Sequence, residues 1–173
     1  NNDLMPIMIY ENQRIIKIRN FEEEFKEVYF VSHVISSGMI MSREALLNVG
    51  MMDIDLFIDW VDTEWCFRAN ILNYKIIQTP AVVITHRLGD YAKKILRFTL
   101  TKHNKIRRYY RVRNGVYLFL HKSYLNKCME KYIIESLLKM FIMHFFQASN
   151  KIKEIINKYF AIKDGITKCI GKI

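Results

Sequence analysis

The sequence predicts a mixed α/β fold whose later part is helical. Short segments rich in β-branched and aromatic residues alternate with helical patterns over roughly the first hundred residues, and only helical patterns follow. The chain has 173 residues, of which 51% are hydrophobic, so it is long and apolar enough to bury a core. Its 6 Gly and 2 Pro leave little room for linkers or low-complexity segments.

The first predicted elements lie between residues 27 and 50. The stretch EVYFVSHVISSGMIMS alternates β-branched and aromatic residues around a Ser-Ser-Gly break, which predicts two extended segments separated by a turn. Ser42 then precedes a short helical pattern, and a serine is a preferred residue at the position that caps a helix. Glu44 in the first turn and Gly50 after the last apolar residue are the matching start and stop signals.

Residues 61–72 fit a second helix, which carries Asp62 and Glu64 in its first turn. Acidic groups are favoured there because they face the positive end of the helix dipole. The stretches KIIQTP and AVVITH follow and predict two short strands, with Pro80 at their junction and His86 at the end of the second. Three later stretches then repeat apolar positions every three or four residues and predict helices over residues 107–121, 131–146 and 151–162.

The charge differs sharply between the two halves of the chain. Residues 1–86 hold 7 Lys/Arg and 12 Asp/Glu, a balance of −5, whereas residues 87–173 hold 20 and 5, a balance of +15. A strongly basic half favours an anionic partner such as a membrane surface, a polyphosphate ligand or nucleic acid.

The three cysteines are widely spaced without a CxxC pair, which indicates a reducing compartment. No secretory leader opens the chain, and its first residues suggest a fragment.

The stretch FIDWVDTEWCFR, residues 57–68, sets three carboxylates in an apolar segment. Asp59, Asp62 and Glu64 are either helix-start groups stabilised by backbone amides and the dipole, or they include a general base in a partly apolar cleft. The residues alone leave both interpretations open.

An ordered series of six blocks resembles the C-terminal part of bacterial family 2 glycosyltransferases, in their rhamnosyltransferase-like branch. The blocks are SGMIMSREAL (37–46), VGMMD (49–53), LFIDWVDTEWCFRA (56–69), NYKIIQTP (73–80), His86 with Gly89, and HNKIRRYYRVRN (103–114). They cover nearly all of residues 30–115; Met52 and Asn73 depart from the family's usual Phe and Gly. The resemblance implies the C-terminal half of a GT-A-type, Rossmann-like domain over residues 1–103, followed by a basic, aromatic-rich helical tail over residues 104–173.

The resemblance also implies an activity. Such an enzyme transfers a sugar, here expected to be rhamnose, from a nucleotide-diphosphate donor to a cell-surface glycan acceptor with inversion, and Asp62 falls on its catalytic base. A base is needed because the attacking acceptor hydroxyl must lose its proton. Glu64 falls on a second acidic position that organises the acceptor pocket. The expected acceptor contacts are Gly38, Asp59, Trp60 and Trp65, although a core role is open for Trp65.

His86 has two interpretations. A histidine at a strand end is commonly a structural residue, whereas the resemblance implies that it joins an upstream DxD motif in holding Mg²⁺ or Mn²⁺. Residues 1–36 contain no such motif, and Asp53-Ile54-Asp55 stands where the family reads FDE. We therefore expect the chain to be a piece of a transferase that is inactive alone.

The basic run from Lys105 to Arg113 has three interpretations. It is a solvated helix face, a cluster over the donor diphosphate with Arg108 and Arg113 in contact with phosphate, or a nucleic-acid patch. No recognised nucleic-acid module frames it, so no nucleic-acid partner is expected.

The tail suggests contact with a membrane. Its longest apolar run, YIIESLLKMFIMHFF, contains Glu135 and Lys139 and is too short to span a bilayer. An amphipathic helix of this kind suits the surface of an anionic leaflet, which fits a lipid-linked glycan acceptor and a cytoplasmic protein peripheral at the inner face of the cell membrane. A helical hairpin that packs on the core or on another subunit is the structural alternative. A non-catalytic membrane- or partner-binding module is the alternative function.

Overall fold

The computed structural model describes residues 6–18, 28–79, 81–82, 84, 92–95, 98–101 and 103–172. The chain divides into two compact units that are interleaved along the sequence. Unit 1 comprises Asn1–Ile54, Val61–Thr85 and Ser123–Tyr132, and unit 2 comprises Asp55–Trp60, His86–Lys122 and Ile133–Ile173. The described residues combine helices with small sheets, as the α/β prediction requires.

Unit 1 contains two antiparallel strand pairs. Strands β1 (Ile7–Glu11) and β2 (Arg14–Ile18) form a hairpin, and β3 (Tyr29–Val31) pairs with β4 (Ile76–Gln78). Asn12 and Gln13 at the hairpin turn have φ of 47° and 58°, the left-handed conformation that suits the twist of a two-residue connection. The backbone amide of Ser32 donates to the carbonyl of Met8, which ties β3 to the hairpin.

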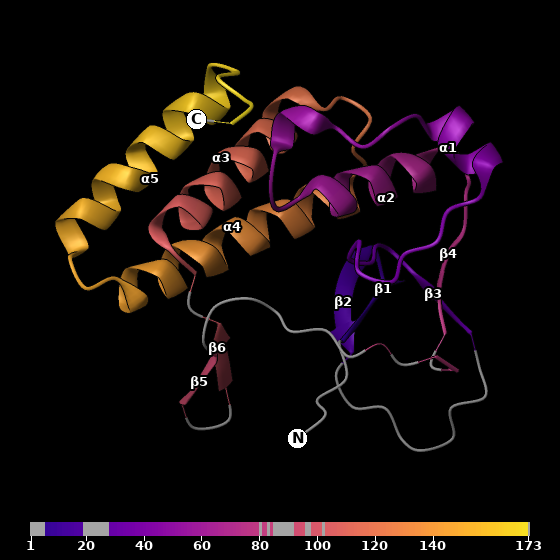
Figure 1. Cartoon of the computed structure of the whole chain (residues 1–173), viewed down its shortest axis with the longest axis horizontal. Coiled ribbons are helices and arrows are strands. Elements are labelled where there is room, and N and C mark those ends of the chain that lie inside the picture. Colours follow the sequence, from indigo (N-terminus) through magenta and orange to yellow (C-terminus); the bar gives the residue numbers. More distant parts are fainter. Residues whose placement is uncertain are drawn as a thin grey trace. The chain divides into compact units, whose positions relative to one another are not determined.

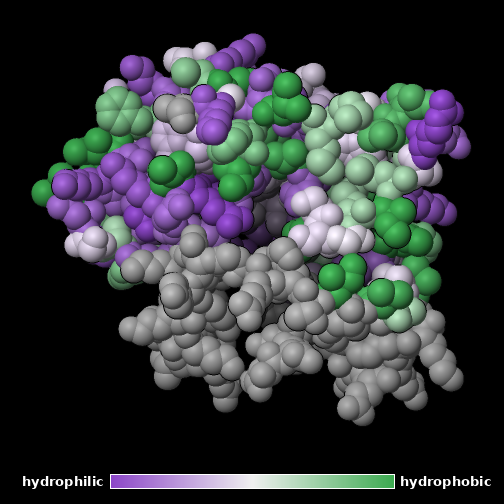
Figure 2. Space-filling view, in the orientation of Figure 1, coloured by the Kyte–Doolittle hydropathy of each residue, from purple (hydrophilic) through white to green (hydrophobic). Residues whose placement is uncertain are grey.

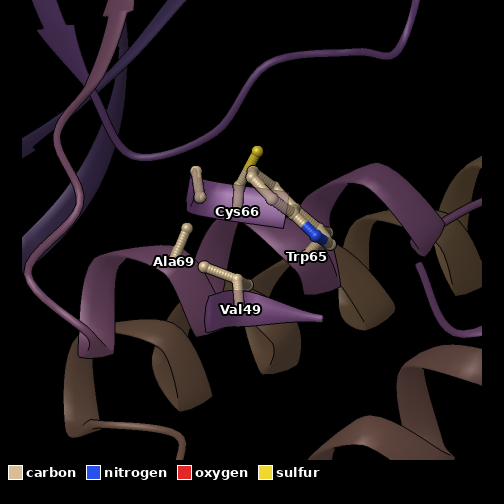
Figure 3. Close-up of a cluster of buried hydrophobic side chains, with 5 residues drawn as sticks. Val49, Trp65, Cys66 and Ala69 are labelled. Atoms are coloured by element: carbon tan, nitrogen blue, oxygen red, sulfur yellow. The ribbon is translucent and has the colours of Figure 1, made fainter. Parts of the chain in front are cut away.

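Helices α1 (Arg43–Val49) and α2 (Val61–Ile71) of unit 1 confirm two predicted elements. Ser42 Oγ accepts from the Ala45 amide at 3.0 Å, and Gly50 ends the helix with a φ of 86°. The side chains of Trp65, Cys66 and Ala69 on α2 pack against Val49 of α1, and this cluster is the core of unit 1 (Figure 3). Capping marks α1 in the sequence, and the mutual packing of the two short helices stabilises both.

The predicted strand over residues 81–86 is wrong where it is described, and the predicted extended segment after the Ser-Ser-Gly break joins no sheet. The side chains of Met39 and Met41 in that segment pack against the core cluster. Ala81 and Val82 lie in a turn and a bend, and the Ala81 amide donates to Thr79 Oγ1 at 3.2 Å. The rest of the second predicted strand, apart from Ile84, lies outside the described residues.

Unit 2 is built mainly from helices. The 3₁₀ turn η1 (Ile54–Leu56) reaches into it, the pair β5 (Ala92–Ile95) and β6 (Phe98–Thr101) forms a hairpin, and α3 (Lys105–His121) and α5 (Lys151–Ile166) pack side by side (Figure 1). Helix α4 (Lys127–Gln147) begins in unit 1 and continues into unit 2, where its Leu137 and Phe141 pack on Tyr109 and Tyr110 of α3. The three predicted helices of the tail are confirmed.

The predicted division between residues 103 and 104 falls directly before α3 and stays a prediction. All pairings between the described strands are antiparallel. The Rossmann-like GT-A fold therefore also stays a prediction.

Candidate functional site

The residues predicted to be functional fall into three groups. Gly38, Asp62, Glu64 and Trp65 belong to unit 1, whereas Asp59, Trp60, Arg108 and Arg113 belong to unit 2. His86 lies outside the described residues, so its role as a metal ligand stays a prediction.

Asp62 presents a half-buried carboxylate in the first turn of α2. Its Oδ2 accepts from the backbone amide of Ser36 at 3.0 Å, and its Oδ1 accepts from the amide of Thr63 at 2.9 Å. These two bonds fix the orientation of the carboxylate against the Ser36 turn. The side chain keeps partial access to solvent, which a proton acceptor for a bound hydroxyl needs.

Gly38 follows that turn with a φ of 79°, in the left-handed region that favours glycine. A Cβ at this position would lie 2.6 Å from Cδ1 of Ile84. The positive φ strains any other residue here, and a Cβ would also force the Ile84 side chain to move, so the turn that orients Asp62 favours glycine.

Glu64 has a very different environment from Asp62, although the two residues are only two positions apart on α2. Only 1% of Glu64 is exposed, and its carboxylate forms a two-pronged ion pair with Arg68, with Oε1 2.7 Å from Nε and Oε2 3.0 Å from Nη2. The hydroxyl of Tyr124 also donates to Oε1, and burial and this carboxylate raise the pKa of Tyr124. Both oxygens of the Glu64 carboxylate are therefore already bonded to side chains inside unit 1.

Arg68 extends the Glu64 ion pair to the loop after α1. Its guanidinium donates to the carbonyls of Val49 at 2.5 Å and Met51 at 2.8 Å. Trp65 reaches the same loop, because its Nε1 donates to the carbonyl of Gly50 at 2.8 Å. With 3% of its surface exposed, Trp65 is a core residue that leaves almost no area for a ligand.

Residues 55–60 of unit 2, DLFIDW, contain several left-handed backbone positions. Phe57, Asp59 and Trp60 have φ of 61°, 60° and 66°, and none of them is glycine. Non-glycine residues in the left-handed region cost free energy and persist only where the surroundings hold them. The segment leads directly into α2, which carries Asp62.

Helix α3 supplies the contacts that hold this segment. Nδ2 of Asn114 donates to the carbonyls of Leu56 at 2.7 Å, Ile58 at 2.9 Å and Asp59 at 3.2 Å. Arg107 forms two bonds to the Asp59 carboxylate, at 2.9 and 3.0 Å. Nε1 of Trp60 donates to the carbonyl of Arg111 at 2.9 Å. One face of α3 therefore fixes both the backbone of the segment and its two polar side chains.

Arg113 completes the support of residues 55–60 and is fully buried. Its guanidinium donates to Oδ1 of Asn114, to the carbonyl of Gly171 at 2.6 Å and, at longer range, to the carbonyls of Asp55 and Leu56. Arg108 pairs with Glu154 at 2.9 Å and donates to the carbonyl of His103. A phosphate contact at either arginine stays a prediction, and it would compete with these bonds.

The sequence analysis missed His33, a buried histidine of unit 1. Its Nδ1 lies 2.8 Å from Ser32 Oγ and its Nε2 lies 3.1 Å from the Tyr132 hydroxyl, while the ring of Phe67 packs at 5.7 Å. Burial lowers the pKa of His33 to about 4, so the imidazole is neutral at pH 7. No local pattern marks this residue, because two of its three partners, Phe67 and Tyr132, come from distant parts of the chain.

Among the described residues, no three side chains of His, Cys, Asp and Glu gather as a metal site would require. The described part of the chain therefore does not fit a divalent metal, and the predicted Mg²⁺ or Mn²⁺ stays a prediction that depends on residues outside it. In the same described residues, no helix combines the length and hydrophobicity needed to span a bilayer.

A comparison with curated proteins identifies a relative. The chain is 39% identical over 143 residues to the dTDP-rhamnosyl transferase RfbF of Shigella flexneri, and the match covers 81% of this chain and 47% of the relative. The chain thus spans about half the length of the curated relative it matches. No family model matches the chain. No solved structure matches it either. The similarity confirms the relationship to rhamnosyltransferases, whereas membership of family 2 and the C-terminal position stay predictions.

Proposed function

We propose that this chain is part of an inverting glycosyltransferase of family 2 that transfers rhamnose from a nucleotide-diphosphate donor to a glycan acceptor. The identity of 39% with a dTDP-rhamnosyl transferase is the observation that carries the proposal. That relative's name suggests dTDP-rhamnose as the donor. The chain would supply the C-terminal half of a GT-A domain, and the donor-binding half would lie in the part of the relative that the match does not cover.

Asp62 is the proposed general base. As the acceptor hydroxyl attacks the anomeric carbon, the new C–O bond forms, the bond to the nucleotide diphosphate breaks, and the Asp62 carboxylate takes the hydroxyl proton. The environments of the two carboxylates support Asp62 over Glu64, because Glu64 is buried in an ion pair with Arg68. Glu64 would organise the site indirectly, by fixing α2 to the loop after α1.

Asp59, on the segment that α3 holds, and the backbone at Gly38 are the proposed acceptor contacts. Trp60 is only 7% exposed and its Nε1 donates to the carbonyl of Arg111, so, like Trp65, it is a core residue with little area for a ligand. A divalent metal stays a prediction, because the described residues contain no ligand cluster and His86 lies outside them. The similarity to a transferase does not favour a non-catalytic binding module.

Transfer by the full-length protein carrying Asp62→Asn tests the role of Asp62. Loss of a general base lowers kcat by about 10² to 10⁴-fold, while donor binding measured by calorimetry stays unchanged. Glu44→Gln is the matched control, because Glu44 is also a first-turn carboxylate, on α1, and should leave kcat unaffected. If Asp62→Asn retains transfer within a few-fold of the wild type, Asp62 is only a helix-start group and the assignment is wrong.

A further inference from the structure

Helix α5 buries charged side chains and exposes apolar ones, whereas a surface helix normally does the reverse. Its buried residues include Glu154 and Lys158, of which 2% and 6% are exposed. Most of its outward residues are apolar: Ile152, Ile155, Ile156, Tyr159, Phe160 and Ile166 are all exposed, Ile152 at 71%. Figure 2 shows hydrophobic side chains on the part of the surface that α5 forms, with hydrophilic side chains between them. A helix that only packed against its own protein would place these residues inward.

The buried polar side chains of α5 are satisfied within unit 2. Glu154 pairs with Arg108 of α3 at 2.9 Å and with Lys158 at 3.1 Å, and Lys158 Nζ lies 3.2 Å from Nδ1 of the buried His144 on α4. This network anchors α5 through its polar face. The inverted orientation is therefore built into the unit and leaves the apolar face directed outward.

Helix α4 adds a second apolar strip on the same unit. Ile134, Leu138, Ile142, Phe145 and Phe146 are exposed and recur at helical spacing, with Phe146 at 76%. Between the two strips lies a groove of about 570 Å³, lined by Phe141, Ile142 and Phe145 of α4 and by Ile155, Tyr159 and Ile162 of α5. Exposed apolar areas of this extent mark interaction surfaces. We call the exposed residues of both strips and this groove the α4–α5 face.

The charges beside the α4–α5 face have one sign. Within residues 133–166, every exposed charged side chain is a lysine: Lys139, Lys151, Lys153 and Lys163. Of the carboxylates in this range, Glu154 is buried in its ion pairs, Asp164 accepts a hydrogen bond from Tyr109, and Glu135 is half-buried. Lys151 Nζ lies over the rings of Phe145 and Phe146, at 4.9 and 6.0 Å, so cation and apolar group are directly adjacent.

We propose that the α4–α5 face docks on the surface of an anionic phospholipid bilayer. The apolar side chains would enter the boundary between headgroups and acyl chains, and the lysines would meet the lipid phosphates. A second copy of the chain fits less well, because a two-fold interface would bring the lysines of one copy against those of the other. A protein that lies on the membrane in this way would meet an acceptor carried by a lipid.

Vesicle binding by the purified chain tests this proposal. Vesicles of phosphatidylglycerol mixed with phosphatidylcholine should bind the chain at least tenfold more tightly than phosphatidylcholine alone, and added salt should weaken that binding. Phe146→Glu and Tyr159→Glu should each lower the affinity tenfold or more. Ile40→Glu is the matched control and should bind normally, because Ile40 is 95% exposed and lies in unit 1. Lys153→Gln should lower the association constant roughly fivefold, as expected for one lysine at an anionic surface.

Three results would overturn the proposal. The first is the absence of binding to anionic vesicles, and the second is equal binding by Phe146→Glu and the wild type. The third is a wild-type dimer in sedimentation experiments that becomes a monomer in Phe146→Glu, when neither protein binds vesicles. Asp62→Asn should bind vesicles normally. Membrane docking and catalysis can therefore fail independently.

Discussion

At the scale of single residues, Asp62 and Glu64 show how environment separates two carboxylates on one helix. Glu64 meets a guanidinium and a phenol inside unit 1, so its charge is balanced and its position is fixed. Asp62 accepts hydrogen bonds from two backbone amides and stays half-exposed, which leaves its outer surface available to a ligand. Composition and spacing assign both residues to a helix start. Helical spacing is enough to suggest the pair of Glu64 with Arg68, four residues on. The contacts with Tyr124 and Ser36 come from distant parts of the chain, which a local pattern does not reveal.

His33 predicts a loss of stability in acid. Its pKa is about 4 in the folded protein and near 6.5 when unfolded, so the unfolded chain binds the extra proton first as the pH falls. The free energy of unfolding therefore has its full value above pH 6.5 and falls as the pH drops below 6.5. By pH 4 the loss due to His33 is roughly 3 kcal/mol. Urea unfolding between pH 7 and pH 4 measures this decline.

His33→Gln is the control for the His33 prediction. It keeps a polar side chain near Ser32 and Tyr132 but does not titrate, so the free energy of unfolding should fall less steeply with acidification than in the wild type. Identical slopes for the two proteins would show that His33 is not the responsible group.

At the scale of elements, α3 acts as a support for residues 55–60. Asn114 satisfies three carbonyls of the segment, and the aromatic ring of Phe57 packs on Tyr110 at 5.1 Å. These contacts offset the cost of three left-handed positions, Phe57, Asp59 and Trp60, within a four-residue stretch. The motif YYRVRN, which the sequence presents as a basic run, therefore works largely inside the protein. Its Arg and Asn hold the segment that precedes the proposed base.

Asn114→Ala should destabilise the protein by about 2 to 4 kcal/mol, because it removes a buried amide and leaves three carbonyls without its donor. Hydrogen exchange of the amides of residues 57–60 should accelerate at the same time. Asn48→Ala is the matched control: Asn48 is exposed and donates to the Tyr74 hydroxyl, so its loss should cost under about 1 kcal/mol. Equal effects of the two variants, by urea unfolding, would contradict the role of Asn114.

The elements also show which features a sequence can predict. The caps of α1, the span of α2 and the three later helices follow from signals that lie within a few residues, and all are confirmed. Features that depend on distant partners were not predicted. The pairing of Met39 and Met41 with a core, the Asn114 contacts and the inverted burial of α5 all require knowledge of which residues meet in three dimensions.

At the scale of the whole molecule, each unit has a core of its own. The core of unit 1 gathers around Trp65, Val49 and Ala69, and that of unit 2 gathers around Tyr109, Tyr110 and Ala161. The acidic first half of the sequence supplies most of unit 1 and the basic second half most of unit 2, which agrees with the different partners that the charge asymmetry predicts. The candidate base lies in unit 1 and the proposed membrane face in unit 2.

Because each unit has its own core, we expect a substitution in one unit to lower the stability of that unit more than the stability of the other. Glu154→Gln removes the carboxylate that balances Arg108 and Lys158 in unit 2, and breaking one partner of a buried ion pair costs about 3 to 5 kcal/mol. Each unit contains one of the two tryptophans, so Trp65→Phe leaves Trp60 as the reporter of unit 2 and Trp60→Phe leaves Trp65 as the reporter of unit 1. Glu154→Gln should lower the urea midpoint reported by Trp60 more than that reported by Trp65. Equal shifts would show that the two units unfold as one cooperative body, because only then does the loss of a charge in unit 2 destabilise both reporters alike.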